Sequence, residues 1–335
     1  MKFSKYDIEM MSHAISLAKK GIYTARPNPM VGCVIVKNNT IIGQGYHQKY
    51  GGNHAEINAL EKTKNPNGST VYLTLEPCFH TGKTPPCVDD LIKAKVKKVI
   101  IAMLDVNPLT TNKSVKKLQQ NNIEVLVGLL EKEARELNKG FIKRITTGIP
   151  FIRAKIAMSL DGKTAMQNGE SKWITGEEAR ADVQKLRAES DVILTGVNTI
   201  LLDNPSLTVR DINCTQPLRI ILDRNNRLKN QKLTVLTDKH KTLILNENLN
   251  SVLKRLGKME INNVLLETGS ILFSAMLKEK LIDEIIIYTA PILLGKTAKN
   301  ILDLDIQNMA DKIKLTQINT QIIGNDTKTI YEVIN

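Results

Sequence analysis

The chain has 335 residues, of which 42% are hydrophobic and 24% are charged, and this balance excludes a disordered or fibrous protein. Its 47 Lys and Arg residues outnumber its 34 Asp and Glu residues, and the net charge of +13 indicates an anionic partner: nucleic acid, a membrane surface or a phosphorylated small molecule. No apolar stretch approaches the roughly 18 residues of a membrane-spanning helix, and the charged N-terminus MKFSKYDIEM is unlike a signal peptide, so we expect a cytoplasmic protein without a membrane partner.

Helical and extended patterns alternate along the whole sequence. An amphipathic helix over residues 7–20, with Asp7 as a possible N-cap, precedes a buried strand at 31–36. That strand returns at 41–42 after a turn at 38–39. The later elements of the first half are a helix from about 54, a strand at 71–75, a helix after 86, a strand at 99–103, a helix near 114–121, a strand at 125–129 and a helix at 131–145. Such alternation predicts an α/β fold.

A domain boundary is predicted near residue 146, which gives domains 1–146 and 147–335. Gly148 can end the preceding helix, and Pro150 opens a new strand. The second half repeats the alternation, with strands at 151–157, 192–194, 220–222, around 234 and 244, 264–267 and 285–288, a helix near 177–189, and closing strands around 313–318 and 328–334.

The strongest chemical signal is His54-Ala55-Glu56 followed by Pro77-Cys78 and Cys87. One imidazole and two thiolates suit a tetrahedral zinc ion, and three protein ligands leave the fourth position for water, as in catalytic zinc sites. Glu56 lies two residues after His54 at a predicted helix start, where its carboxylate can move protons without binding the metal. The same order of residues is the signature of zinc-dependent nucleobase deaminases.

Two plainer interpretations of these residues stay open. Cysteines are among the most buried residues, so Cys78 and Cys87 can be packing residues beside an incidental histidine. A structural zinc site would need a fourth protein ligand, for which His80 is the only plausible residue. Of the other two cysteines, we expect Cys33 to be a core residue, and Cys214 lies in a polar loop without a partner motif.

Several longer stretches of the sequence resemble one known family. They are residues 27–33 (PNPMVGC), 43–47 (GQGYH), 54–56 (HAE) and 74–87 (TLEPCFHTGKTPPC) in the first half, and 155–164 (KIAMSLDGKT), 169–175 (GESKWIT) and 203–210 (DNPSLTVR) in the second. These stretches are similar to the bifunctional deaminase/reductase of riboflavin biosynthesis, over essentially the whole chain. The resemblance implies an N-terminal cytidine-deaminase-like α/β/α domain with zinc and a C-terminal α/β domain like dihydrofolate reductase.

The resemblance also implies two successive reactions on a phosphorylated small molecule. The first removes the 2-amino group of 2,5-diamino-6-hydroxy-4-(5-phosphoribosylamino)pyrimidine and yields 5-amino-6-(5-phosphoribosylamino)uracil. The second reduces the ribosyl chain of that product to ribityl with NADPH. By resemblance, His54, Cys78 and Cys87 hold zinc and Glu56 shuttles protons. Asn28 hydrogen-bonds the pyrimidine, unless it is an ordinary turn amide. A homodimer or homotetramer is implied as well.

The reductase half carries no G-x-G-x-x-G motif within residues 150–335, so its residues alone do not predict a Rossmann fold. Free backbone N–H groups at Gly269-Ser270 could hold phosphate at a helix start, although ordinary capping explains the same residues. By resemblance, the cofactor contacts are Ala157, Trp173, Thr199, Asp203, Arg224, Gly269, Ser270, Ile271, Leu272, Phe273, Ser274 and Ala275, and the substrate contacts are Ser171, Arg187, Leu207, Arg210 and Glu267.

Three arginines of this half are predicted to lie near bound phosphate or cofactor. Arg187 and Arg210 could clamp the 5′-phosphate, because guanidinium groups match phosphate bidentately. Arg224 stands where some family members place a serine that touches the cofactor, and Thr268 departs from a common Glu-Gly-Gly form.

A nucleic-acid-editing deaminase is the main competing hypothesis. The aromatic content of 4%, with no basic stripe interleaved with Phe or Tyr, disfavours it, so we expect no nucleic-acid partner. A non-enzymatic protein with a structural zinc is disfavoured by the count of three ligands.

Overall fold

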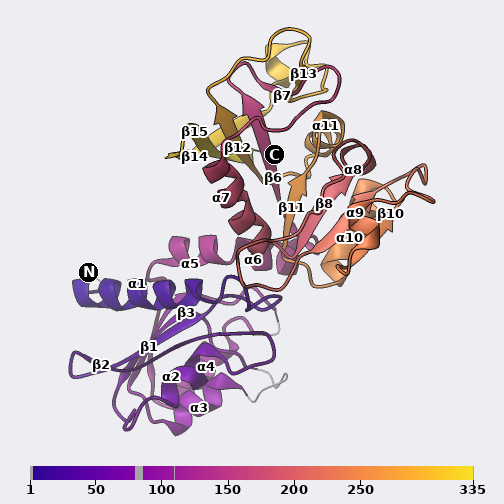
Figure 1. Cartoon of the computed structure of the whole chain (residues 1–335). Coiled ribbons are helices and arrows are strands. Elements are labelled where there is room, and N and C mark those ends of the chain that lie inside the picture. Colours follow the sequence, from indigo (N-terminus) through magenta and orange to yellow (C-terminus); the bar gives the residue numbers. More distant parts are fainter. Residues whose placement is uncertain (1–2, 80–85, 109, 335) are drawn as a thin grey trace. The chain divides into compact units, whose positions relative to one another are not determined.

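The computed structural model describes residues 3–79, 86–108 and 110–334. The chain forms two compact units, Met1–Gly148 and Ile149–Asn335 (Figure 1). Helix α6 (Lys139–Thr147) ends at Gly148, whose left-handed backbone with φ of 76° suits glycine. Among the described helices, none is long and apolar enough to cross a membrane.

The first unit is a three-layer arrangement around a five-stranded sheet of order β2-β1-β3-β4-β5 (Figure 1). Its strands are β1 (Gly32–Lys37), β2 (Thr40–Tyr46), β3 (Thr70–Leu75), β4 (Lys98–Met103) and β5 (Glu124–Val127), and its other helices are α1 (Lys5–Lys19), α2 (Ala55–Leu60), α3 (Cys87–Lys93), α4 (Lys113–Gln120) and α5 (Glu131–Leu137). Strand β1 is antiparallel to β2 and β3, whereas β3, β4 and β5 are parallel. This is the expected deaminase-like α/β/α arrangement.

Alternate residues of β1 explain why helices cover both faces of this sheet. Val34 packs with Met11 of α1 on one face, whereas Cys33 packs with Ala55 of α2 on the other, because successive strand side chains point to opposite faces. Cys33 is fully buried, as expected of a core residue. Gly45 lets α2 lie directly on β2, since a Cβ there would come within 2.6 Å of the Ala55 carbonyl oxygen. This close approach fixes the N-terminal end of α2 against the sheet.

The second unit contains an eight-stranded sheet of order β10-β9-β8-β11-β6-β12-β15-β14. Its strands are β6 (Phe151–Ser159), β8 (Val192–Gly196), β9 (Leu218–Leu222), β10 (Thr242–Leu245), β11 (Asn263–Glu267), β12 (Glu284–Ala290), β14 (Lys314–Ile323) and β15 (Asp326–Ile334), its helices are α7 (Glu177–Ala188), α8 (Val197–Asp203), α9 (Thr234–Thr237), α10 (Leu249–Lys258) and α11 (Ser270–Lys278), and smaller elements are β7 (Lys163–Ala165), β13 (Lys299–Asn300) and a 3-10 turn (Met309–Asp311). The six strands β10, β9, β8, β11, β6 and β12 are parallel to one another. Strand β15 is antiparallel to β12, and β14 is antiparallel to β15.

Alternate residues of β11 likewise pack on opposite faces of this second sheet. Val264 packs with Val252 of α10 and Met276 of α11 on one face, and Leu265 packs with Ala179 of α7 on the other. The six parallel strands all end at the same edge of the sheet. In open α/β sheets ligands bind at that edge.

Three predicted elements differ in the structure. Ser4, not Asp7, is the N-cap of α1: the Ser4 hydroxyl accepts a hydrogen bond from the Asp7 backbone N–H, and the Asp7 carboxylate accepts one from the Ser4 backbone N–H. The helix predicted at 131–145 is broken at Asn138, whose side chain bonds the backbone N–H and carbonyl of Met30 instead. The strand predicted around 234 is the short helix α9, which buries Val235.

Candidate active sites

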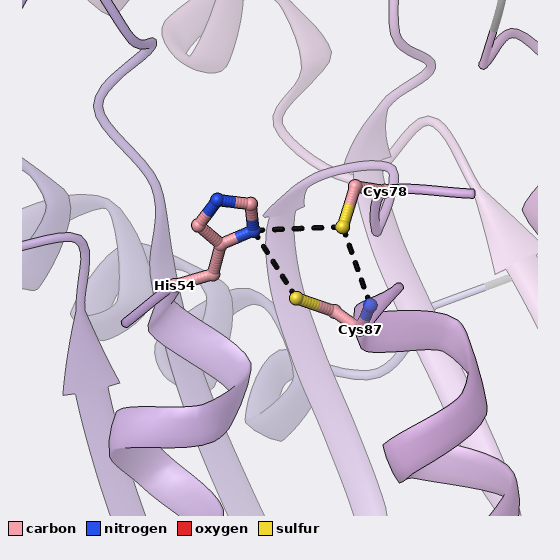
Figure 2. A group of neighbouring side chains, drawn as sticks. All are labelled: His54, Cys78 and Cys87. Atoms are coloured by element: carbon pink, nitrogen blue, oxygen red, sulfur yellow. Dashed lines mark hydrogen bonds between the residues drawn. The ribbon is translucent and has the colours of Figure 1, made fainter. Parts of the chain in front are cut away.

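His54, Cys78 and Cys87 come together in the first unit from three separate elements (Figure 2). His54 is the N-cap of α2, Cys78 follows β3, and Cys87 is the first residue of α3. The Nδ1 atom of His54 lies 3.2 Å from the Sγ atom of Cys87 and 3.5 Å from that of Cys78 (Figure 2). In this cluster all the ligand atoms lie within 4.8 Å of one another.

This cluster fits a tetrahedral zinc ion. Zn–N and Zn–S bonds of about 2.0 and 2.3 Å at tetrahedral angles separate nitrogen and sulfur ligands by about 3.5 Å, close to the two separations observed. Hydrogen bonding by Cys87 lowers the pKa of Cys78 to about 4, and the same pairing raises the pKa of Cys87. One sulfur is therefore a thiolate at neutral pH, which is the form that binds metal. The potential fourth ligand His80 lies outside the described residues.

Glu56 lies in the first turn of α2, two residues after His54, and is only 3% exposed. Burial is the largest cause that raises the pKa of Glu56 to about 7, and the neighbouring Cys78 adds to it. A carboxyl group with a pKa near neutrality can both accept and return a proton. Its place matches the proton-transfer role predicted from the sequence, and that role stays a prediction.

Asn28 is oriented by His47, a residue for which the sequence predicts no role. Its Nδ2 atom lies 3.1 Å from Nε2 of His47, whose Nδ1 atom lies 3.1 Å from the Asn53 carbonyl oxygen. Since a carbonyl oxygen only accepts, His47 carries its proton on Nδ1 and accepts from Asn28 at Nε2. Burial lowers the pKa of His47, which favours this neutral form. The amide oxygen of Asn28 is thereby turned away from His47. His47 follows β2 within the GQGYH stretch, which is the signal that could have drawn attention to it.

The second unit has a cavity of about 680 Å³ above the carboxyl ends of its parallel strands. Strands β6, β8, β9 and β11 reach it through Ala157, Gly196, Leu222 and Glu267, respectively. Helix α11 begins there at Ser270, and its N-cap Gly269 has no side chain that could bond the first N–H groups. The cavity therefore joins open backbone donors to charged side chains, a combination that suits a phosphorylated ligand.

A buried charge cluster lies on the wall of this cavity. Arg187 donates from Nε and Nη2 to the two carboxylate oxygens of Glu267, at 2.6 and 3.0 Å. Lys155 approaches the same carboxylate at 3.5 Å. Burial alone would raise the pKa of Glu267, but these two cations outweigh it and hold the pKa at about 2. By resemblance, Lys155 belongs near this site, but the sequence predicts no specific contact for it; it precedes Ala157 by two residues on the same strand.

Most of the residues predicted for the reductase site line this cavity. Those that do are Ala157, Ser171, Arg187, Thr199, Asp203, Leu207, Arg224, Glu267, Gly269, Ser270, Ile271, Leu272 and Ala275. Phe273 and Ser274 are buried on the core side of α11, because consecutive helical residues point in different directions.

The two arginines predicted to clamp the 5′-phosphate, Arg187 and Arg210, have different surroundings in the structure. Arg187 directs its fork to Glu267 rather than into open space. Arg210 is exposed, outside the residues that line the cavity, and its backbone N–H bonds Gln184.

Trp173 also lies outside the cavity lining. It is 71% exposed, and the Arg180 guanidinium lies 4.5 Å from the centre of its ring. Sequence reasoning also missed Asn198, Asp223 and Arg227, which line the cavity without belonging to a quoted motif.

Comparisons with known proteins agree with this division into two sites. A family model described as "RibD C-terminal domain" matches residues 150–329, and one described as "Cytidine and deoxycytidylate deaminase zinc-binding region" matches residues 4–103. The riboflavin biosynthesis protein RibD of Buchnera aphidicola is 45% identical over 97% of this chain and 98% of its own length. The protein of the same name from Escherichia coli is 43% identical over 90% of this chain and 92% of its own length.

Solved structures give the same result. Acinetobacter baumannii RibD (form 2) superposes with a TM-score of 0.92 at 41% identity, covering 98% of this chain and 99% of that one. A diaminohydroxyphosphoribosylaminopyrimidine deaminase/5-amino-6-(5-phosphoribosylamino)uracil reductase from Thermotoga maritima also gives 0.92, at 33% identity and with coverage of 98% and 99%.

Proposed function

Because the chain belongs to the RibD family of riboflavin biosynthesis proteins, we propose that it is the bifunctional enzyme that deaminates a phosphoribosylaminopyrimidine and then reduces the product. The substrate proposed for the first unit is 2,5-diamino-6-hydroxy-4-(5-phosphoribosylamino)pyrimidine, and that for the second is 5-amino-6-(5-phosphoribosylamino)uracil. The observation that carries the proposal is the convergence of His54, Cys78 and Cys87 beside the buried Glu56, in a chain that also has a charged cavity at the strand ends of its second unit.

In the deaminase unit the three ligands would hold a catalytic zinc ion. When bound, such an ion acts as a Lewis acid and brings the pKa of water down to about 7. The Glu56 carboxylate would take a proton from the attacking water at one of its oxygens and deliver it to the departing amine. Asn28, held through Nδ2 by His47, would accept a hydrogen bond from the pyrimidine at its amide oxygen.

In the reductase unit the cavity would hold NADPH and the phosphoribosyl substrate together. NADPH supplies a hydride for the ribose C1′. The uncapped N–H groups at the start of α11 would bind cofactor phosphate. Glu267 keeps the Lys155 ammonium at the cavity wall, where it can donate hydrogen bonds to the substrate. Ser171, whose hydroxyl lies 3.3 Å from Asp203, and Leu207 would place the ribosyl chain.

A single assay tests both halves of this proposal. The zinc-loaded chain, given the phosphoribosylaminopyrimidine and NADPH, should release ammonia first and oxidise NADPH afterwards. RNA offered in place of the pyrimidine should release no ammonia. Deamination of RNA, or no NADPH oxidation with authentic deaminated intermediate, would overturn the proposal for the respective unit.

We also propose that the chain forms a homo-oligomer through strand β14. This ten-residue strand is at the end of the sheet, and its outer edge pairs with no strand in the described part of the chain. It exposes Leu315, Ile318 and Ile322, at 40%, 51% and 80%. A long edge with exposed apolar side chains is a template for pairing, and an antiparallel pair about a two-fold axis satisfies two copies equally. The cytoplasmic location stays a prediction from the sequence.

A further inference from the structure

The segment 204–210 carries part of the proposed substrate site but is neither helix nor strand. Leu207 in its middle has a left-handed backbone with φ of 49°, a conformation that residues with a Cβ rarely adopt. The same residue is only 3% exposed, packs with Ile221 and Val235, and lines the cavity. Something outside the segment must therefore hold this backbone in place.

Two buried guanidinium groups hold the carbonyl oxygens on either side of Leu207. Arg187 donates from Nη1 to the Thr208 carbonyl oxygen at 3.0 Å, and Arg219 donates from Nη1 to the Ser206 carbonyl oxygen at 2.7 Å. Arg187 belongs to the cavity wall, as described above. Arg219 instead lies on β9, away from the cavity lining, with no exposed surface.

Arg219 is itself fixed on its far side. The Asp238 carboxylate accepts from Nη1 at 2.7 Å and from Nη2 at 2.5 Å, and the carbonyl oxygens of Val235 and His240 accept from Nη2. These bonds compensate the buried charge and leave the guanidinium a single orientation. The hydrogen bond from Arg219 is the largest cause of the lowered pKa of Asp238.

We propose that Arg219 is a positioning residue of the reductase: anchored by Asp238, it holds the Ser206 carbonyl so that Leu207 keeps its left-handed backbone against the substrate. This inference rests on the proposed reductase function. Because Leu207 would contact the phosphoribosyl group in the ground state and in the transition state alike, loosening it should weaken substrate binding more than the chemical step.

The test is steady-state kinetics on the full-length chain with 5-amino-6-(5-phosphoribosylamino)uracil and NADPH. Arg219→Lys keeps the charge but cannot serve Ser206, Asp238 and the two other carbonyls at once. We expect its KM for the uracil to rise about tenfold or more while kcat stays within about twofold. The KM for NADPH and the rate of ammonia release should not change.

A matched control variant and a double-mutant cycle with Leu207 distinguish positioning of the segment from general destabilisation of the fold. Arg153 on β6 is also partly buried and pairs with Glu284 and Glu189, so Arg153→Lys disturbs an ion pair of the same sheet without touching segment 204–210. It should leave the KM for the uracil unchanged. Leu207→Gly removes the side chain that Arg219 is proposed to position, so it should raise the KM by itself, and adding Arg219→Lys in that background should raise it little further.

Several results would overturn the inference. One is an Arg219→Lys variant with unchanged KM and only a lower unfolding midpoint, and another is an equal rise in KM in the Arg153→Lys control. If Arg219→Lys does not fold, Asp238→Asn takes its place, with an expected rise in KM of about threefold; an unchanged KM there overturns the inference too. Absence of reductase turnover in the wild-type chain would instead refute the proposed function itself.

Discussion

Arg187 and Glu267 form a two-point ion pair on the wall of the reductase cavity, with N–O distances of 2.6 and 3.0 Å. Both side chains are largely buried, at 13% and 9% exposed. The pair therefore belongs to the framework of the site. Because Nη1 also donates to the Thr208 carbonyl oxygen, Arg187 keeps one N–H on Nη1 and one on Nη2 for a ligand.

The ion pair should make the stability of the second unit depend on pH in the acid range. The pKa of Glu267 is held at about 2, below its ordinary value of 4.5, so the ionised carboxylate stabilises the fold above pH 4.5 and this contribution disappears as pH falls toward 2. Glu267→Gln should lower the free energy of unfolding by about 3 kcal/mol at pH 7. The difference from wild type should close between pH 4.5 and 2.

Urea unfolding at a series of pH values measures this difference, with the transition of the second unit identified by its shift on adding NADPH. Glu332→Gln, at an exposed position of β15, is the control and should leave the transition unchanged. A gap between wild type and Glu267→Gln that widens in acid would contradict the assigned role of the ion pair.

Glu56→Gln should abolish ammonia release, because an amide of the same shape cannot accept the proton from water. The rate of ammonia release should fall by about 10²- to 10⁴-fold or more, as for loss of a general acid/base group. Zinc content, measured by atomic absorption, should be unchanged, and reduction of the authentic uracil intermediate should proceed at the wild-type rate. Substantial ammonia release by this variant would show that another group transfers the proton.

Removal of zinc with a chelator should stop the first reaction and spare the second. The three ligands all lie in the first unit, and the cavity residues named for the reductase all lie in the second. Ammonia release should return when zinc is restored, and Cys87→Ser should prevent that recovery. Loss of NADPH oxidation together with the metal would contradict the separation of the two sites.

Trp173 offers a direct optical test of its predicted contact with NADPH, since it is the only tryptophan of the chain. If the cofactor packs against its exposed ring, titration with NADPH should quench tryptophan emission and produce energy transfer to the nicotinamide, with the same midpoint as the KM. Trp173→Phe should then raise the KM for NADPH. Unchanged emission at saturating NADPH would remove Trp173 from the cofactor site.

Ile322→Lys should convert the proposed oligomer to a smaller species. Lysine on an open strand edge opposes pairing between copies, and an 80% exposed position tolerates the change within one copy. Light scattering after size exclusion gives the mass. Ile8→Lys, at an exposed position of α1, is the control. A mass that stays at the wild-type value in Ile322→Lys would exclude β14 as the contact.

The sequence predicted the zinc cluster better than it predicted the reductase cavity. His54, Glu56, Cys78 and Cys87 have chemically distinctive side chains in a fixed order, and each stands at the end of a helix or strand whose pattern is legible. The cavity instead depends on backbone positions such as Gly196, on which strands are neighbours, and on residues such as Arg227 that follow a strand without a motif. The sequence pattern does not show which strands pair with which in the sheet.

The same limit explains Arg187 and Arg219. An arginine in a sequence is most often a solvated charge, and nothing local announces that Glu267 or Asp238 will be its partner, because 80 and 19 residues separate the pairs. Likewise, the break at Asn138 depends on Met30, 108 residues away. Long-range partners of this kind are visible only after the fold is known.

The two sheets share no strand, and each unit closes its own core. Genetic complementation should follow. A cell that carries one copy with Glu56→Gln and a second copy damaged only in the reductase unit still holds one sound unit of each kind. Such a cell should make riboflavin, although a cell that carries either defective copy alone should not.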